Sequence, residues 1–265
     1  MFRKIGFIGC GNMGGALARA VSDGTDAQIY LSDKDEEKAK ALSEEIGADV
    51  IDIKELAEKC DMIFLGVKPQ VMADMLSEIK SVLAARRDRF VLVSMAAGLE
   101  MKTIRQMSGS NYPIVRIMPN LPVSVEEGMV LYTSDDLTMR ESDDFVDVMK
   151  KAGRLLPLEE KLFDAGCALS GSGPAFVFMF MDALAKGGVA AGLTEDQAKI
   201  LACQTVKGSA KMLMESIKTA EELKISVCSP GGTTIEGVKA LDAAKFEDAV
   251  ESAVDAAYKR SLEMH

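Results

Sequence analysis

The sequence predicts two domains: an α/β domain with a doubly wound parallel sheet over residues 1–158, and an all-α domain over residues 159–265. Three observations carry this prediction. Short apolar runs alternate with helical patterns as far as residue 157, a glycine-rich turn follows the first apolar run, and the rest of the chain has a helical rhythm. A chain of 265 residues is long enough for two domains with apolar cores of their own.

Five short runs are predicted to be strands because they are rich in apolar and β-branched residues. They show little polar alternation, which is typical of strands buried on both faces of a parallel sheet. The runs are KIGFIG (4–9), AQIYLS (27–32), MIFLGV (62–67), FVLVSM (90–95) and PIVRIM (113–118). The stretch DEEKAKALSEEIG (35–47) between two of them repeats apolar residues every three or four positions, so helices are expected to cover the sheet.

The rhythm of the sequence changes after GRLLPL (153–158). The stretch AFVFMFMDALAKGGVAAGL (175–193) is apolar on nearly every side, which is typical of a helix at the centre of a bundle or at an interface. The next helix is expected to begin after Thr194, because Gln197 lies three residues further on and completes a capping box.

The stretch SGSGPAF (170–176) precedes the apolar helix. Ser170 and Ser172 are expected to cap this helix, and Pro174 suits its first turn. A loop that borders a ligand has the same composition, but capping is taken as its main role.

The glycine-rich turn IGCGNMG (8–14) has G-x-G-x-x-G spacing between the first strand and an amphipathic helix. Gly9 permits a tight turn, Gly11 lets the backbone approach a pyrophosphate, and Gly14 lets the helix pack closely on the strand. The helix N-terminus adds free N–H groups and positive potential. Ordinary turns also show this spacing, but its place after the first strand predicts a Rossmann-like dinucleotide site. The candidate contacts here are Ile8, Gly9, Gly11, Asn12, Met13 and Gly14.

The end of the second strand bears on the choice of cofactor. Asp33 lies about 20 residues after the glycine turn, where a carboxylate can bind a ribose 2′-hydroxyl and would repel a 2′-phosphate. Ser32 and Lys34 flank it and can instead receive that phosphate. NADH and NADPH both remain open at this point.

Two further strand ends are candidates for cofactor contact, because the carboxyl ends of strands border the ligand crevice in doubly wound sheets. Val67, Lys68 and Pro69 follow the third predicted strand, although an isolated lysine there is more often an ordinary surface charge. Ala96 and Ala97 follow the fourth, where small residues allow close approach of a nicotinamide.

Composition argues against several kinds of partner. Lys plus Arg number 31 and Asp plus Glu 41, for a formal net charge of −10, and no long basic run occurs. Nucleic acid and membranes are therefore not expected partners. No apolar run approaches the roughly 18 to 20 residues of a membrane helix, and the first residues lead directly into a strand rather than an export signal, so a cytoplasmic protein is expected.

Cysteine and histidine usage limits the chemistry. The cysteines are odd in number, scattered and never at C-x-x-C spacing, so reduced thiols are expected, with neither a disulfide framework nor a metal site. They are Cys10, Cys60, Cys167, Cys203 and Cys228. The single histidine is the last residue, so catalysis must use hydroxyls, carboxylates, lysines, backbone amides or a bound cofactor.

With these features in place, the chain resembles pyrroline-5-carboxylate reductases over essentially its whole length. The resemblance is carried by IGCGNMG, GVKPQ, VSMAAG and RIMPNLP, and above all by LSGSGPAFVFMFMDALAKGGVAAGL and SPGGTTIEGVKALD. It implies an N-terminal dinucleotide-binding domain and a helical domain that intertwines with a second subunit in a homodimer or larger homo-oligomer. The implied reaction is the reduction of 1-pyrroline-5-carboxylate to L-proline by hydride from NADPH or NADH.

The resemblance places the substrate, a small cyclic imine bearing a carboxylate, on the segment SPGGTT (229–234). Backbone N–H groups at the start of a helix can receive the carboxylate without a basic side chain. The implied substrate-binding residues are Ser229, Gly231, Gly232, Thr233 and Thr234. Thr234 is the catalytic candidate, because it stands at the family position whose hydroxyl faces the ring nitrogen. The same residues also suit an ordinary capped loop before a helix.

Some positions depart from the family pattern. The resemblance also assigns Asn120 to the cofactor site, but Leu121 replaces the threonine that usually follows it. Ile53 stands where an asparagine near the adenosine is common, and Ile217 falls where some relatives carry a glutamate. These departures concern cofactor preference and kinetics rather than fold.

Two alternatives to a pyrroline-5-carboxylate reductase remain open. One is a related imine or β-hydroxyacid oxidoreductase on the same two-domain plan, for which Lys186 is the candidate acid/base on the helical domain. The other is a non-catalytic dinucleotide-binding protein. Oxidation of the cofactor on addition of the imine separates the three possibilities.

Overall fold

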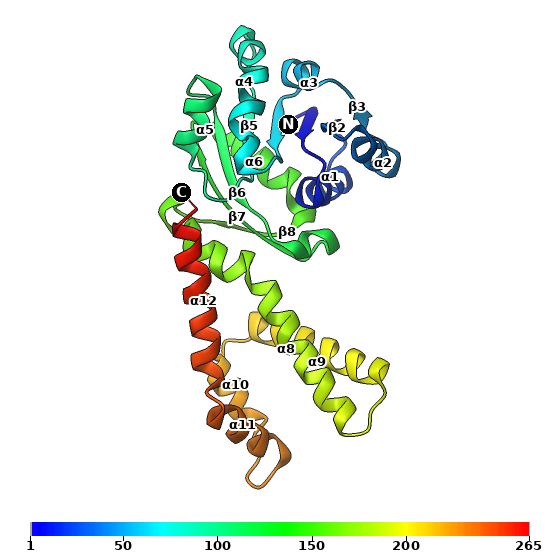
Figure 1. The fold of residues 1–265 in the computed structure, drawn as a ribbon, viewed down its shortest axis with the longest axis vertical. Coiled ribbons are helices and arrows are strands. Elements are labelled where there is room, and N and C mark those ends of the chain that lie inside the picture. The colour runs from blue at the N-terminus through cyan, green and yellow to red at the C-terminus, as the bar shows by residue number, and fades with distance from the viewer. Residues whose placement is uncertain (1, 265) are drawn as a thin grey trace. The chain divides into compact units, whose positions relative to one another are not determined.

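The computed structural model describes residues 2–264, which form two compact units (Figure 1). The first unit comprises the chain as far as Gly171 together with the residues from Tyr258 onward, and the second comprises Ser172–Ala257. Each unit is described separately below.

The first unit is built on one eight-stranded sheet with the order β3-β2-β1-β4-β5-β6-β7-β8. Neighbouring strands are parallel except for β6 and β7, which pair antiparallel. The strands are β1 (Lys4–Ile8), β2 (Gln28–Ser32), β3 (Asp49–Val50), β4 (Met62–Leu65), β5 (Val91–Ser94), β6 (Ile114–Met118), β7 (Gly128–Asp135) and β8 (Gly153–Pro157). The order reverses between β1 and β4, as in a doubly wound sheet, so the predicted fold class is confirmed.

Helices cover both faces of this sheet, because alternate residues of each strand point to opposite sides. The helices are α1 (Asn12–Gly24), α2 (Glu36–Ile46), α3 (Ile53–Lys59), α4 (Pro69–Ala85), α5 (Met101–Ser108) and α6 (Met139–Val148), with short 3-10 turns η1 (Leu121–Val125) and η2 (Lys150–Ala152). Phe64 of β4 packs with α1, α2 and α6 in one core, while its neighbours Ile63 and Leu65 pack with α3, α4 and α5 in the other. The ring of Phe64 stacks on that of Phe7, with centroids 4.4 Å apart.

The five predicted strands are all present, with ends within two residues of those expected. Sequence reasoning missed three more strands: β3, β7 and β8. The strand β3 has only two residues, too few for a periodic signal. The strand β8 lies at the edge of the sheet with β7 next to it, and both are partly exposed, so their sequences lack the continuous apolar character of the central strands.

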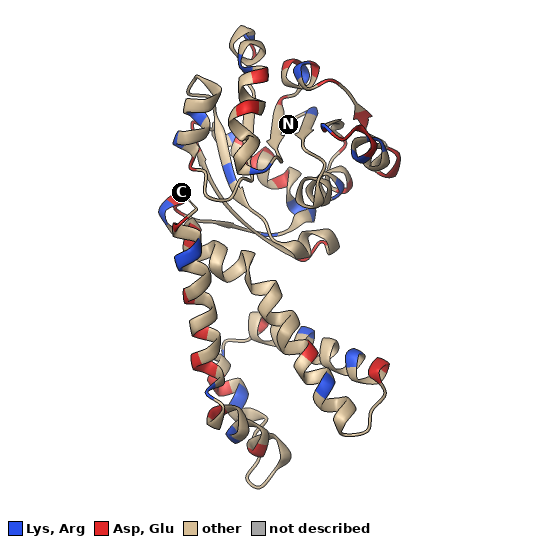
Figure 2. Ribbon diagram, viewed as in Figure 1, with Lys and Arg blue, Asp and Glu red and all other residues tan. Residues whose placement is uncertain are grey.

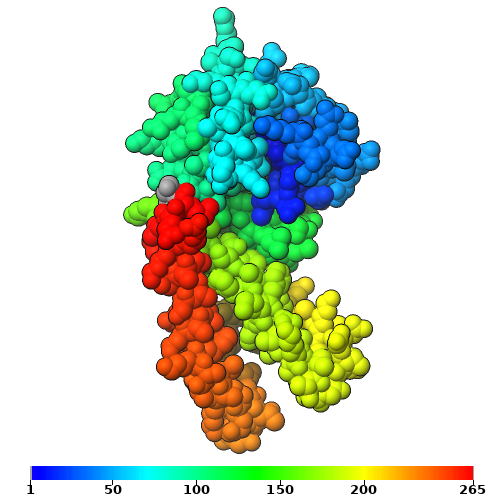
Figure 3. Space-filling model, in the orientation of Figure 1, coloured from blue at the N-terminus to red at the C-terminus, as the bar shows by residue number. Residues whose placement is uncertain are grey.

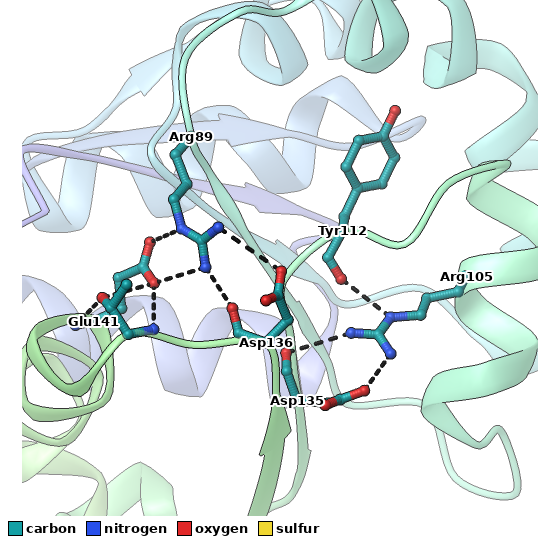
Figure 4. A network of polar contacts seen from close by, with 7 residues as sticks. Arg89, Arg105, Tyr112, Asp135, Asp136 and Glu141 are labelled. Carbon is teal, nitrogen blue, oxygen red and sulfur yellow. Dashed lines mark hydrogen bonds and ion pairs between the residues drawn. The ribbon is translucent and has the colours of Figure 1, made fainter.

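An ionic network joins Arg89, just before β5, and Arg105 of α5 to the end of β7 and the start of α6 (Figure 4). Arg89 donates through Nε to Glu141 at 2.7 Å and also bonds the backbone oxygen of Asp136. Arg105 pairs with Asp135 and donates to the carbonyl of Tyr112. Because β7 runs antiparallel to β6, its last residue, Asp135, lies beside the first residue of β6. The network therefore links the elements around this end of the two strands.

The chain continues to pack on the first unit beyond the boundary that the sequence predicted at residue 158. The segment after β8 forms η3 (Glu160–Leu162), α7 (Phe163–Gly166) and a π-helical turn η4 (Cys167–Gly171). Arg116 of β6 is buried and holds this segment through an ion pair with Glu160 at 3.0 Å and by stacking on Phe163. The compact unit therefore ends at Gly171, because contacts from β6 that no local pattern reveals extend it.

The second unit is helical, and the last helix leads back into the first unit. Its elements are α8 (Gly173–Ala190), α9 (Glu195–Glu215), α10 (Ala220–Ser226), α11 (Thr233–Ala243) and α12 (Phe246–Leu262). The capping box of Thr194 and Gln197 is present. At the start of α8 Pro174 lies in the first turn, and Ser172 occupies the cap position without a side-chain bond to the helix. Ser170 instead donates its hydroxyl to the carbonyl of Gly166 at 2.9 Å, so its predicted capping role is wrong.

Helix α8 is apolar but has no buried residue in the single chain. Along the helix only Asp182 and Lys186 are charged, and its ribbon is otherwise uncharged in Figure 2. Side chains of α8, yellow-green in the space-filling view, lie at the surface (Figure 3). The continuous helical stretch Glu160–Ala190 has the length and hydropathy of a membrane span, contrary to the expectation that no such run exists. An exposed apolar surface of this kind marks an interaction face.

Candidate active site

The glycine loop has the geometry of a phosphate cradle at the start of α1. Gly9 has φ +101°, a conformation that favours glycine, and its N–H donates to the carbonyl of Ser32 at 2.8 Å. Gly11 is the N-cap residue and no side chain caps the helix. The first N–H groups of α1, from Asn12, Met13 and Gly14, are therefore presented toward the loop.

The glycines of this loop meet different surroundings. A Cβ on Gly14 would lie 2.1 Å from the carbonyl oxygen of Gly9, so this glycine is required for helix and strand to pack. A Cβ on Gly11 would meet no atom within 4 Å. Open space beside free N–H groups fits a pyrophosphate, so the residues present suit a dinucleotide.

One glycine contact at this site was not predicted. Gly66 follows β4, and a Cβ there would lie 2.8 Å from the carbonyl oxygen of Gly9. The strand end and the glycine loop therefore approach each other closely across the point where the strand order reverses. A glycine directly after the apolar run MIFL is the signal in the sequence that points to this contact.

A cavity of about 830 Å³ opens beside the loop. It brings together eight of the predicted cofactor residues, namely Ile8, Gly9, Gly11, Ser32, Asp33, Lys34, Val67 and Lys68. Its wall also includes Asp52 and Ile53, from the start of α3, and Glu78 of α4. Ile53, one of the departures from the family pattern, thus lines the cavity and gives that wall an apolar patch.

Asp33 fixes the end of β2 to the glycine loop. Its Oδ2 accepts the N–H of Cys10 at 2.6 Å, and its Oδ1 accepts the N–H of Asp35 at 2.8 Å. Each carboxylate oxygen keeps a lone pair for a further donor. Burial, together with the charge of Asp33, raises the pKa of the Cys10 thiol to about 12, so this cysteine stays protonated at neutral pH.

Lys34 and Lys40 both line the cavity near Asp33, but they differ in whether they form an ion pair. Lys40 is paired with Glu36 at 3.0 Å. Lys34 is exposed and has no ion pair with any residue in the range 2–264. Lys34 is therefore the cation of this pair that is available to an anionic ligand.

The remaining predicted cofactor residues lie outside the lining of this cavity. Pro69 is the first residue of α4, after Lys68 at the N-cap. Ala96 follows β5 and packs in the apolar core, and Ala97 is half-buried. Asn120 is buried after β6, where both ends of its side-chain amide bond protein groups.

The predicted substrate segment forms the loop before α11 in the helical unit. The N–H of Gly232 donates to the carbonyl of Ser229 at 3.0 Å, and Gly231 has φ +71°. Gly232 is the N-cap of α11, again with no side-chain cap, so the N–H groups of Thr233 and Thr234 lie in an uncapped first turn. The chain thus has a second anion-receptive helix start, and both threonines are exposed.

Four other residues named in the sequence analysis lie outside the glycine loop and the substrate segment. Lys186 pairs with Asp182 on its own helix at 2.6 Å. Cys228 is half-buried beside the substrate segment. Leu121 and Ile217 are both exposed to solvent. None of these contacts favours the β-hydroxyacid alternative.

Comparisons with known proteins agree with this arrangement. A family model described as pyrroline-5-carboxylate reductase dimerisation matches residues 160–264, and one described as NADP oxidoreductase, coenzyme F420-dependent, matches residues 4–98. The pyrroline-5-carboxylate reductase of Escherichia coli is 38% identical over 98% of this chain and 98% of its own length. That of Aquifex aeolicus is 37% identical over 95% and 94%.

Solved structures give the same result. The crystal structure of Plasmodium falciparum pyrroline carboxylate reductase with NADP bound is 32% identical, with a TM-score of 0.88 over 98% of this chain and 97% of that one. The Coxiella burnetii pyrroline-5-carboxylate reductase has a TM-score of 0.89 at 30% identity, with coverage of 98% and 97%. Sequence and fold agree over nearly the whole length, and the chain belongs to the pyrroline-5-carboxylate reductase family.

Proposed function

We propose that this protein reduces 1-pyrroline-5-carboxylate to L-proline, with hydride supplied by NADPH or NADH. The observation that carries the proposal is the presence, in one chain, of an open glycine cradle at α1 and an uncapped SPGGTT segment at α11. Relatives named for this activity are 33–38% identical over nearly the full chain.

The residues of the first unit would hold and orient the dinucleotide. The N–H groups at the start of α1 receive the pyrophosphate, with Gly11 leaving room for it. Asp33 and Lys34, at the end of β2, are assigned to the adenosine ribose, and Val67 of the same cavity to the nicotinamide side. Ala97, after β5 and outside the lining of that cavity, is also assigned to the nicotinamide side. When bound, the reduced nicotinamide supplies the hydride.

The segment before α11 would bind the imine. The N–H groups of Thr233 and Thr234 would donate hydrogen bonds to the substrate carboxylate, aided by the positive end of the helix. In this arrangement backbone N–H groups, rather than a histidine or another basic side chain, hold the anionic substrate.

The reaction makes modest demands on acid catalysis. The ring nitrogen of the iminium already carries a proton. Hydride adds to the imine carbon, and the electron pair of the C=N double bond moves to the nitrogen, which gives a neutral secondary amine. An iminium is already electrophilic, and the site must mainly orient it and stabilise the change in charge. We assign Thr234 to the ring nitrogen, where its hydroxyl hydrogen-bonds the group whose charge is lost during the reaction.

The helical part of the chain, residues 159–265, is proposed as the dimerisation and substrate domain. The apolar surface of α8 is then covered by a second copy of the chain rather than by a bilayer. Phe163, inside the stretch with membrane-like hydropathy, is buried against Arg116 of the sheet, so that stretch is not free to cross a membrane. We place the enzyme in the cytoplasm, without nucleic acid or membrane partners.

Initial rates of NADPH and NADH oxidation, measured in parallel with 1-pyrroline-5-carboxylate, test the proposal. Substrate-dependent oxidation of either cofactor, with L-proline as the product by mass spectrometry, is the expected result. If both cofactors bind but neither is oxidised on adding the imine, the assigned reaction is wrong while the dinucleotide site stands.

A further inference from the structure

Asn120 is held by the protein at both ends of its side-chain amide. Its Nδ2 donates to the carbonyl of Ser170 at 2.9 Å, and its Oδ1 accepts the N–H of Met129 at 2.9 Å. The side chain lies where only 9% of the residue is exposed. The two partners differ in kind, one an acceptor and one a donor, so together they fix which way the amide points.

The bond to Ser170 reaches the turn that leads into α8. Ser170 belongs to the π-helical turn η4, and π-helical turns are rare and often stand at functional sites. A Cβ on Gly171, the last residue of the turn, would lie 3.2 Å from Cε of Met118 at the end of β6. The turn is therefore packed directly against the end of β6, two residues before Asn120.

The bond to Met129 reaches the start of β7. Asn120 precedes the 3-10 turn η1, and the chain returns through Glu126 and Gly128 to pair β7 with β6. By accepting the N–H of Met129, the side chain closes the loop between the two strands. One amide thus joins the carboxyl end of β6, the start of β7 and the turn before α8.

Neighbouring contacts brace the same segment from other directions. Glu160 pairs with Arg116 at 3.0 Å and also accepts the N–H of Met101, at the start of α5, at 2.8 Å. Asp164 accepts the hydroxyl of Ser261, near the end of α12, at 2.7 Å. The segment between β8 and α8 is therefore tied to the loops that follow β5 and β6. The first of these loops contains Ala97, which is assigned to the nicotinamide side, and the second contains Asn120.

We infer that Asn120 is a positioning residue, which acts through the backbone it holds rather than by touching the cofactor. It sets the loop after β6 against the π-helical turn η4, so that these two segments of the first unit and the start of β7 are held in one arrangement. This inference rests on the proposed function, and it replaces the cofactor contact that the sequence suggested for this residue.

Two substitutions at this position separate positioning from contact. Asn120→Leu has a similar volume but removes both hydrogen bonds. Asn120→Asp keeps the oxygen that accepts the N–H of Met129. Its second carboxylate oxygen faces the carbonyl oxygen of Ser170, and the two oxygens repel each other. Ser124→Ala is the matched control, because its exposed hydroxyl bonds only Leu121 within the same 3-10 turn.

Direct cofactor titration by nicotinamide fluorescence and steady-state kinetics are measured for each variant. We expect the cofactor Kd of both Asn120 variants to stay within about threefold of the wild type, since no contact to the dinucleotide is lost. We expect kcat to fall roughly tenfold or more, because the loop after β6, on the cofactor side of the site, is no longer held in one geometry. Ser124→Ala is expected to match the wild type in both quantities.

Amide hydrogen exchange provides a readout that needs no turnover. Exchange in residues 163–171 is expected to quicken in Asn120→Leu, while exchange in the glycine loop remains unchanged. Asn120→Asp adds a second check, because a protonated aspartic acid restores the donor to Ser170. Its kcat relative to the wild type is expected to recover as the pH falls from about 8 toward 5, with no such recovery in Asn120→Leu.

Two outcomes would overturn the inference. A cofactor Kd weakened more than tenfold in both variants, with unchanged exchange in residues 163–171, would assign Asn120 to cofactor contact. A lower melting temperature with normal kcat and Kd would reduce it to a purely structural role. If the wild type binds cofactor but does not reduce the imine, the exchange and titration results still decide the inference, and only the proposed function falls.

Discussion

The glycines of the first loop carry two separable requirements, one for binding and one for folding. A side chain on Gly11 meets only open space in the protein, whereas one on Gly14 collides with the backbone of Gly9. Gly11→Val is therefore expected to fold normally but to lose dinucleotide binding, because the valine occupies the space of the pyrophosphate. Gly14→Ala is expected to lower the free energy of unfolding by several kcal/mol, in the range for a strained core.

Denaturant unfolding and cofactor titration of the two variants check this prediction. The expected pattern is a wild-type unfolding midpoint without binding for Gly11→Val, and a lowered midpoint for Gly14→Ala. Normal cofactor affinity in Gly11→Val would contradict the assignment of the loop.

Thr234 is the residue on which the chemical step is proposed to depend. Thr234→Val keeps the shape of the side chain and removes its hydroxyl, so kcat/KM for the imine is expected to fall by an amount equivalent to about 1–3 kcal/mol. Cofactor Kd should stay constant, since the residue lies in the helical unit, on the substrate segment. Thr233→Val serves as the comparison at the neighbouring exposed position. Unchanged turnover in Thr234→Val would remove this hydroxyl from the mechanism.

Asp33 and Lys34 act in opposite directions on the choice between NADH and NADPH. Removing the carboxylate charge in Asp33→Asn is expected to raise the ratio of kcat/KM for NADPH over NADH by roughly tenfold, because repulsion of a 2′-phosphate is relieved. Lys34→Gln is expected to lower the same ratio. Parallel initial rates with the two cofactors measure it. Ratios that move together in both variants would place the ribose elsewhere.

At the scale of single elements, α9 depends on its capping box. Thr194 and Gln197 satisfy each other's backbone N–H groups at the start of this helix. Thr194→Ala is expected to cost about 1 kcal/mol of unfolding free energy, which corresponds to a melting temperature lower by roughly 2–4 °C. Ser209→Ala, at an exposed position inside the same helix, is the control and should not destabilise. Thermal unfolding of the two variants distinguishes the cap from a general serine or threonine effect.

The elements also show where periodicity fails as a guide. The central strands β1, β4 and β5 are buried on both faces and were visible as unbroken apolar runs. The strand β7 has exposed residues at its end and shows no such run, although it pairs with both β6 and β8. A strand that is exposed over part of its length carries a weaker hydrophobic signal, because water rather than a second layer covers that part.

At the scale of the whole molecule, α8 has no buried residue in the single chain, and we propose that a second copy of the chain covers it. Met179 is 72% exposed on this helix in the single chain, although its surroundings are almost entirely apolar. Met179→Glu is expected to dissociate the homo-oligomer and to reduce activity, because burying an unpaired carboxylate at the interface costs several kcal/mol. Size-exclusion chromatography with light scattering measures the change.

The matched control for the interface is Met139→Glu. Met139 is as apolar and is exposed, but it lies on α6 of the sheet unit, outside the region matched by the dimerisation family model. The oligomer is expected to persist in this variant. Dissociation by both substitutions would point to a general loss of stability rather than to an interface on α8.

The sequence by itself determined the fold class, five strands, the glycine cradle and the family, because these depend on local periodicity and on motifs of fixed spacing. Tertiary structure alone decided the rest. It attached residues 159–171 to the sheet unit through Arg116, joined Asp33 to the glycine loop at Cys10, and enclosed Asn120 between Ser170 and Met129. These contacts join residues that are far apart in the chain, and the partner of a buried polar group is set by the packing of elements rather than by its neighbours in sequence.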